Sequence, residues 1–133
     1  MTTCPICKKG TLHPYEGTEA HLGITIDVTG QRCDACGEIL YDAAEVKRQE
    51  RAFADGVIAR GVRTADEFKW VRKSAGLRAN EVAELLDVRP ETVSRWERGE
   101  VEIPRTVAFA LGELYDRPRV TRDKLEAFAR AAP

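Results

Sequence analysis

Two pairs of cysteines, each with the spacing Cys-x-x-Cys, constrain the fold of this chain more than any other feature. They are the only four cysteines in its 133 residues: Cys4, Cys7, Cys33 and Cys36. Two such turns can bring four sulfur atoms to the corners of a tetrahedron, which suits Zn²⁺ because this ion binds thiolates at about 2.3 Å. The sequence therefore predicts one zinc ion per chain, with all four cysteines as its ligands.

Four thiolates leave the zinc ion no open position for water, so we expect a structural metal rather than a catalytic one. A glycine follows each pair, at Gly10 and Gly37, where a bend would turn backbone N–H groups toward the sulfur atoms. The pattern is typical of a zinc ribbon, with a β-hairpin between two cysteine turns. Because so small a domain has little apolar core, metal binding should supply folding free energy.

The segment between the cysteine pairs has the alternation of a β-strand. Apolar residues alternate there with polar or small ones: Leu22, Ile24, Ile26 and Val28. Thr29 and Gly30 are expected to end this strand. His13 and His21 are then surface residues of the hairpin, since four cysteines already complete the metal shell.

Two disulfides would also account for four cysteines, but they suit an oxidising compartment. No basic region and apolar stretch precede Cys4, so we expect no signal peptide and a cytoplasmic location, where thiols stay reduced. No apolar run near eighteen residues predicts a membrane span. A thioredoxin-like site needs a strand before the cysteine pair and a helix after it, and neither is evident. A redox sensor built on these cysteines is a further alternative.

Residues 43–60 have helical character, because Val46, Phe53 and Val57 recur at one-turn and two-turn spacings among charged residues. Gly61 is expected to end this helix. We interpret the segment as a connector between a small β-rich domain and a helical domain, which makes the chain an α+β protein. The expected division is residues 1–42 for zinc binding, 43–63 for the connector and 64–133 for the helical domain.

The C-terminal half carries start and stop signals for five short helices. Thr64 and Glu67 form a capping box before the first helix, and Gly76 should end it. Pro90 and Pro104 each begin a helix, since proline is favoured at the first helical position. The expected ranges are about 65–75, 80–88, 90–98, 104–116 and 121–131. Short helices joined by tight turns that contain glycine favour a helix-turn-helix domain.

Residues 77–99, LRANEVAELLDVRPETVSRWERG, resemble the Cro/repressor type of helix-turn-helix. The match rests on residues that this type shares after its first helix, within its second and at the end of its third: Gly76, Leu77, Ala83, Glu97 and Gly99. With an N-terminal four-cysteine domain in a chain of this length, the whole sequence resembles the MqsA (YgiT-type) antitoxins of bacterial toxin–antitoxin systems.

This resemblance implies an antitoxin whose zinc domain binds a cognate toxin and whose helical domain represses its own operon. Repression would use a homodimer on a palindromic double-stranded operator, with the last two helices, Leu125 and Phe128 at the dimer contact. It also implies that Arg72 and Glu97 form an internal salt bridge. Trp96 occupies an inward position of the helix at 90–98, so we expect it in the core. A stand-alone transcriptional regulator with a structural zinc domain is the alternative.

The N-terminal part of the helix at 90–98 would enter the major groove of DNA. Arg95 is the first candidate for base reading, because arginine can bind guanine O6 and N7 together, and it lies where the antitoxins carry a base-reading arginine. The other exposed candidates on this helix are Glu91, Thr92 and Ser94. Glu91 departs from the asparagine of the family, and its carboxylate would suit cytosine N4 instead.

Three arginines flank the recognition helix and are candidates for phosphate contacts: Arg78, Arg98 and Arg105. Arg78 is a second departure, since the family has a Ser or Thr cap there followed by Gln. The formal net charge of −1 neither indicates nor excludes DNA binding. We expect no enzymatic activity, because the sequence has no paired carboxylates in a plausible cleft, no phosphate loop and no nucleophile–base signature.

Overall fold

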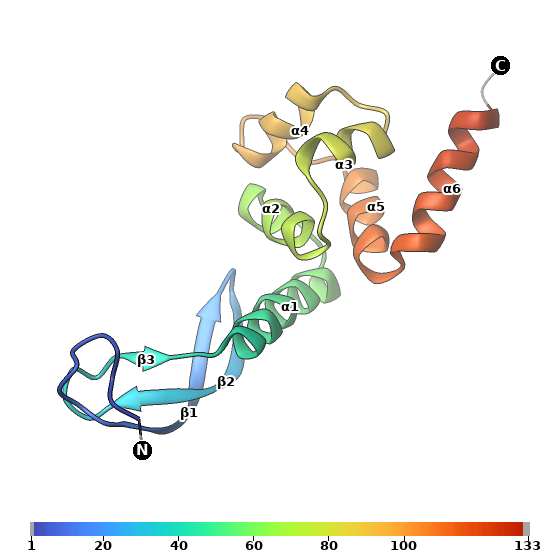
Figure 1. Cartoon of the computed structure of the whole chain (residues 1–133). Helices are drawn as coiled ribbons and strands as arrows, with labels where there is room; N and C mark the ends of the chain where they lie inside the picture. The colour runs from blue at the N-terminus through green and yellow to red at the C-terminus, as the bar shows by residue number, and fades with distance from the viewer. Residues whose placement is uncertain (1, 132–133) are drawn as a thin grey trace. The chain divides into compact units, whose positions relative to one another are not determined.

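The computed structural model describes residues 2–131, which form a three-stranded antiparallel sheet followed by six helices (Figure 1). This is the α+β class that the sequence predicts. The elements are β1 (Leu12–His21), β2 (Ile24–Cys33), β3 (Ile39–Leu40), α1 (Ala43–Arg60), α2 (Ala65–Ser74), α3 (Ala79–Leu85), α4 (Pro90–Glu97), α5 (Arg105–Asp116) and α6 (Pro118–Ala131). Within this range no helix has the length and apolar character to cross a bilayer. Two compact units divide the chain, one ending at Phe53 and the other beginning at Ala54, so their boundary falls inside α1.

The first unit is built on the long antiparallel hairpin of β1 and β2. Its register starts with Leu12 opposite Cys33 and continues to the two-residue turn Leu22-Gly23. Both turn residues have positive φ, 55° and 74°, as a tight turn of the I′ type requires. The hairpin predicted between the two cysteine pairs is therefore confirmed.

The strand β2 does not end at Thr29 and Gly30, as the sequence suggested, but continues to Cys33. Gly30 stands at the point where β3 and the following chain approach β2. A β-carbon on Gly30 would lie 2.5 Å from the carbonyl oxygen of Leu40 and 2.7 Å from the ring of Tyr41. Glycine is used here for close approach between neighbouring segments, not to end the strand.

Beyond β3, the outer edge of β2 is covered by side chains of α1. Glu45 accepts a hydrogen bond from the backbone N–H of Thr29 at 2.9 Å, and Arg48 donates to the carbonyl oxygen of Asp27 at 2.6 Å. Hydrogen bonds from Arg48, Thr29 and Gln49 lower the pKa of Glu45 to about 2. These contacts satisfy edge groups of β2 that would otherwise invite another strand.

The apolar residues at helical spacing in α1 are not all buried. Val46 is 41% exposed, while its neighbour Glu45 is buried. The reason is that this turn of α1 meets the hydrogen-bonding edge of β2 instead of an apolar surface. Phe53 and Val57, the other two residues of the pattern, are buried.

The second unit begins with the last turns of α1, where Ala54 and Val57 are buried. Tyr115 of α5 donates a hydrogen bond to Asp55 at 2.8 Å. Glu67, in the capping box predicted at the start of α2, fixes the α1–α2 connection. Burial raises the pKa of Glu67, but N–H donors from Arg63 and Thr64 and the guanidinium of Arg60 outweigh it and leave this pKa lowered.

The apolar core of the second unit comes from one face of each of four helices, α2 to α5. Its fully or nearly fully buried members are Phe68, Val71, Val82, Ala83, Val93, Trp96, Leu111 and Leu114. The rings of Phe68 and Trp96 lie 5.8 Å apart between centroids. The prediction that Trp96 is a core residue is confirmed.

All five predicted helices of the C-terminal half are present, and two of them have one end that differs from the expected position by three residues. The helix α3 stops at Leu85 instead of 88, because Asp87 adopts a positive φ of 55° that a helix cannot continue through. The helix α6 starts at Pro118 instead of 121, with proline at its first position, where the missing N–H has no cost. Leu86 is half-buried in the turn after α3.

Candidate metal centre and nucleic-acid interface

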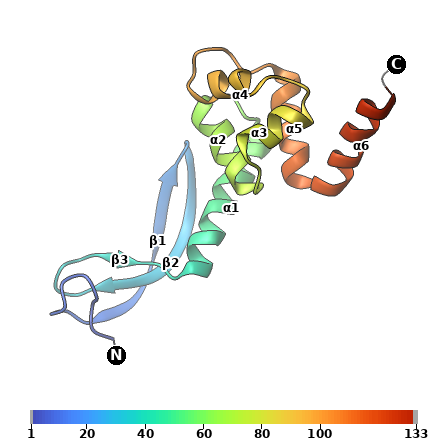
Figure 2. The same cartoon turned by 45° about the horizontal axis from the view of Figure 1, so that its top comes forward.

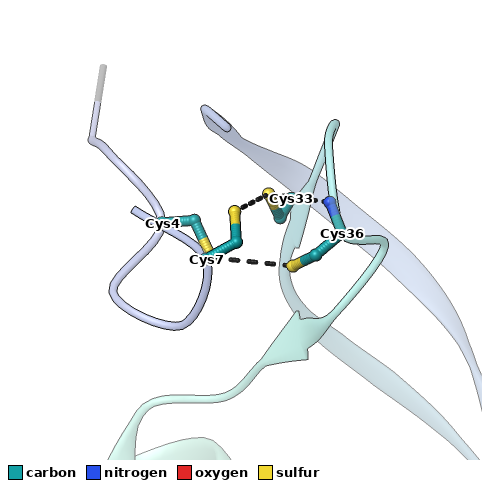
Figure 3. Close-up of side chains that lie close together, drawn as sticks. All are labelled: Cys4, Cys7, Cys33 and Cys36. Carbon is teal, nitrogen blue, oxygen red and sulfur yellow. Dashed lines mark hydrogen bonds between the residues drawn. The ribbon is translucent and has the colours of Figure 1, made fainter. Parts of the chain in front are cut away.

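The four cysteines converge from two turns at the open end of the hairpin (Figure 3). Cys4 and Cys7 precede β1, Cys33 ends β2, and Cys36 lies in the turn that follows. The sulfur atoms of Cys4 and Cys36 are 3.9 Å apart, and those of Cys7 and Cys33 are 3.6 Å apart. All four sulfur atoms lie within 4.8 Å of one another, and none is in a disulfide.

These separations match what a tetrahedral zinc ion needs. Bonds of about 2.3 Å to four thiolates require sulfur atoms about 3.8 Å apart, and the two observed distances of 3.6 and 3.9 Å bracket that value. Among residues 2–131, the cluster contains no histidine or carboxylate ligand beside the cysteines. The site therefore has the size and donor set for one metal ion in a closed, all-thiolate shell.

Backbone N–H groups around the cluster favour the thiolate form. Gly10 donates toward the sulfur of Cys7 at 3.4 Å, and two N–H groups of the following turn point at Cys33, also at 3.4 Å. The N–H groups of Lys9 and Gly10 lower the pKa of the Cys7 thiol to about 6. Only glycine fits at position 10, since a β-carbon there would collide with the sulfur of Cys33.

Asp34, which no motif singles out, connects the two cysteine turns. One carboxylate oxygen accepts from the N–H of Thr11 at 2.9 Å, and the other lies 3.1 Å from Nε2 of His13. The Thr11 N–H and then the His13 imidazole lower the pKa of Asp34. His13 and His21 both lie on the hairpin and outside the metal cluster, as predicted, and the ring of His21 meets the ring of Phe53 edge-on at 5.5 Å.

The helix-turn-helix predicted for the second unit consists of α3 and α4, while α2 packs against α4 and α5 packs against α2 (Figure 2). The turn is closed by a hydrogen bond of 2.9 Å from the N–H of Val88 to the carbonyl oxygen of Ala83. Pro90 occupies the first turn of α4, as expected. Local sequence signals thus place the start of the candidate recognition helix.

A buried ion pair joins α2 to α4 in this arrangement. Arg72 donates from Nε and Nη2 to the two carboxylate oxygens of Glu97, at 2.5 and 2.9 Å, and from Nη1 to the carbonyl oxygen of Leu77 at 2.9 Å. The side chains of Arg72 and Glu97 are only 10% and 11% exposed. The predicted internal salt bridge is confirmed.

The core side of α4 is held by Val93 and Trp96, and its other side carries the predicted base-reading residues. Glu91 and Arg95 are exposed, whereas Thr92 and Ser94 are half-buried. Ser94 is also engaged within the chain, because its hydroxyl oxygen accepts from Arg98 at 2.9 Å. The charged members of the predicted set are therefore the ones that face solvent.

The three predicted phosphate-binding arginines differ in their surroundings. Arg98 is paired with Glu100 at 2.9 Å. Arg78 precedes α3, has a side chain that is 77% exposed, and lies 3.1 Å from Glu81. Its side chain has no acceptor to cap the helix, and Glu81 accepts instead from the backbone N–H of Arg78 at 3.0 Å. Arg105 is exposed at the first position of α5.

The helix α6 carries apolar surface with no buried residue of its own. Phe128 is 77% exposed, Val120 is 51% exposed, and Leu125 is half-buried. Leu125 and Phe128 line a hollow of about 830 Å³ formed with α3 and α5. Trp70 is half-buried on α2.

Comparison with known protein families finds a match for the helical part of the chain. Residues 64–125 match the family model for a helix-turn-helix domain, and this range covers α2 to α5 and part of α6. No curated protein matches the chain in a sequence search. The domain match and the cysteine cluster together fit a zinc-containing helix-turn-helix protein. The resemblance to MqsA-type antitoxins stays a prediction.

Proposed function

We propose that this protein is an antitoxin that binds its own operator as a homodimer and represses transcription, and that also binds a cognate toxin. The observation that carries the DNA-binding part is α4 itself, in a matched helix-turn-helix domain. Its buried residues hold the helix against the core, while Glu91 and Arg95 stay exposed. An exposed helix in this position is the element that such domains insert into the major groove.

In the proposed complex Arg95 reads a guanine through two hydrogen bonds, and Glu91 and Thr92 contact neighbouring bases. Ser94 is half-buried and accepts a hydrogen bond from Arg98. Its main role in the complex is therefore to hold Arg98 rather than to contact bases in the major groove. Arg78, Arg98 and Arg105 contact phosphates on either side. The near-neutral net charge means that affinity for DNA has to come from this local arrangement of arginines.

The metal in this proposal is a single structural Zn²⁺ per chain, held by Cys4, Cys7, Cys33 and Cys36. The sulfur separations and the absence of other ligands in the described cluster support this assignment. The ion would add folding free energy to a unit whose own apolar cluster is small. We propose no enzymatic role for it, because four thiolates leave no open coordination position.

The proposed homodimer uses α5 and α6, and one helix-turn-helix alone reads only one half-site. The exposed Phe128 and the half-buried Leu125 beside the hollow support this surface. A symmetric pair of these surfaces would bury apolar area that a monomer leaves in water.

The DNA-binding part is tested with duplexes selected from a random pool by the full chain. Arg95→Ala should weaken binding to the selected duplex by about 1–3 kcal/mol per half-site and relax the preference at one base pair. Arg78→Ala should weaken selected and scrambled duplexes alike and lower the salt slope by about one. Arg119→Ala, an exposed arginine of α6, is the matched control. Unchanged binding by Arg95→Ala would contradict the role of α4.

The toxin-binding part rests on the sequence resemblance and needs a separate test. The gene beside the one for this chain should encode a small toxin whose product co-purifies with the protein. If co-expression of that product yields no complex, the stand-alone regulator is the better description. In that case the proposal of operator binding would remain, and the proposal of toxin binding would be wrong.

A further inference from the structure

The strand β1 has an open edge. The order of strands is β1-β2-β3, so β1 has a neighbour on one side only. At its start the N-terminal segment closes the other side, where the N–H of Leu12 donates to the carbonyl oxygen of Thr2 at 2.9 Å and Thr3 bridges Thr11. In residues 2–131 no strand continues this pairing along the rest of β1.

The register shows which backbone groups of β1 point outward. Residues of an antiparallel pair alternate between facing the partner strand and facing away from it. Asp27 and Thr29 face away from β1, because their backbone groups bond to Arg48 and Glu45 of α1. The residues opposite them in β1 are Thr18 and Glu16, so these two must also direct their N–H and C=O groups away from β2.

By the same alternation Pro14 and Ala20 face outward, as Leu12 does. The open edge therefore comprises residues 14–20. It offers the N–H groups of Glu16, Thr18 and Ala20 and the carbonyl oxygens of the same residues and of Pro14. This length suits an ordinary partner strand of about six residues. The two edges of the hairpin thus differ. Side chains of α1 bond to the edge of β2, whereas within residues 2–131 no strand pairs with the outer edge of β1 from Pro14 to Ala20.

Charge decides what kind of strand fits this edge. The sequence of β1, LHPYEGTEAH, contains Glu16 and Glu19 and no lysine or arginine. Pairing two copies of β1 would gather four carboxylates along one short ribbon, with like charges on each face of it, which disfavours self-association. Glu16 and Glu19 are three residues apart, so their side chains lie on opposite faces of the strand. A strand that carries lysine or arginine on both of its faces would meet these carboxylates with opposite charge.

We propose that the edge of β1 at residues 14–20 binds a basic, extended segment of a partner protein as an added β-strand. Main-chain hydrogen bonds to Glu16, Thr18 and Ala20 would supply affinity, and the two glutamates would select basic side chains. The inference rests on the partner binding in the proposed function and names its surface. It does not depend on DNA binding.

The test uses the isotope-labelled full chain and a synthetic peptide of about ten residues with blocked ends. In this lysine–valine peptide two lysines alternate with two valines, so that each face of the strand carries lysine. At millimolar peptide the backbone amides of Glu16, Thr18 and Ala20 should shift and exchange more slowly with solvent. A glutamate–valine peptide should bind about tenfold more weakly, because like charges then face each other.

A proline variant tests the backbone contact directly. Thr18→Pro removes one outward N–H that serves no contact within the hairpin, and Pro14 shows that this edge accepts proline. It should weaken the lysine–valine peptide about tenfold, whereas Thr18→Val, which keeps the N–H, should not. Metal content and the amide spectrum confirm that the hairpin is intact. Glu16→Lys combined with Glu19→Lys, which leaves the backbone intact, should reverse the preference between the two peptides.

Several results would overturn the inference. They are no binding of the lysine–valine peptide, equal binding by a folded Thr18→Pro variant, or no change of preference after charge reversal. Amide shifts that grow with protein concentration alone would assign the edge to a second copy instead. None of these results bears on operator binding or on co-purification with a toxin, so this inference and the proposed function fail separately.

Discussion

Replacing Glu97 with Ala would leave the guanidinium of Arg72 buried without its carboxylate. In the structure Arg72 makes three hydrogen bonds, two to Glu97 and one to the carbonyl oxygen of Leu77, and its side chain is only 10% exposed. Removing one partner of such a pair costs about 3–5 kcal/mol, because the remaining charge is uncompensated. For a unit of this size we expect the Tm of the second unit to fall by about 12 °C or more.

The assay is urea unfolding followed by tryptophan fluorescence. The chain has two tryptophans, Trp70 and Trp96, and both lie in the second unit, so the signal reports that unit alone. Glu100→Ala is the matched control, because Glu100 pairs with Arg98 at 2.9 Å but the two side chains are 51% and 58% exposed. A surface pair of this kind contributes about 0–1 kcal/mol.

Replacing both partners separates the cost of an orphaned charge from the value of the pair. Arg72→Met combined with Glu97→Leu removes both charges and should recover most of the loss, although the carbonyl oxygen of Leu77 loses its donor. The reasoning would be refuted if Glu97→Ala cost no more than Glu100→Ala. It would equally be refuted if the double variant were as unstable as the single one.

Three further predictions concern the metal, the dimer and pH. Cys33→Ser should abolish the binding of one zinc per chain and unfold the first unit, which metal analysis and amide spectra would show. The fluorescence transition of the second unit should be unchanged. Full metal content in this variant would contradict the prediction. Phe128→Lys should lower the mass found by light scattering at micromolar concentration from two chains to one, and Val101→Lys, an exposed valine outside α5 and α6, should not. The pKa of Glu45 is lowered from 4.5 to about 2, so its stabilising effect is complete above pH 4.5 and is lost as pH falls from about 4.5 to about 2. The amide of Thr29 should therefore exchange faster in Glu45→Ala than in the parent at neutral pH, and this gap should close toward pH 2; a gap independent of pH would contradict the role of the carboxylate.

The helical half could be predicted well because its signals are local. The capping box of Thr64 and Glu67 and the prolines at 90 and 104 act within one turn of the residues they organise. The sequence therefore predicts the starts of α2 and α4 to the residue and that of α5 to within one. The end of α3 is different, since it depends on the positive φ of Asp87, which nothing in the local sequence marks.

The hairpin was harder because its limits depend on segments far away in the chain. Gly30 reads as a strand end when it is considered alone, yet it is required by the approach of Leu40 and Tyr41. Val46 reads as a core residue at helical spacing, yet its turn of α1 meets the edge of β2. Periodicity reports that a helix has two faces, but it does not report whether a face meets an apolar core or a row of backbone hydrogen-bonding groups.

Three carboxylates that connect separate segments of the chain show which of these connections can be predicted from the sequence and which cannot. Glu67, Glu97 and Glu45 are each largely buried, and each connects two segments of the chain by accepting several hydrogen bonds. The capping box predicts a fixed role for Glu67, and the repressor-type resemblance predicts one for Glu97. Glu45 belongs to no such pattern, because its partner outside α1 is the backbone of a strand, at a residue sixteen positions away. The hydrogen bond from Thr29 to Glu45 also covers part of the edge of β2. Glu45, which no sequence pattern marks, therefore helps to leave β1 as the open edge of the hairpin.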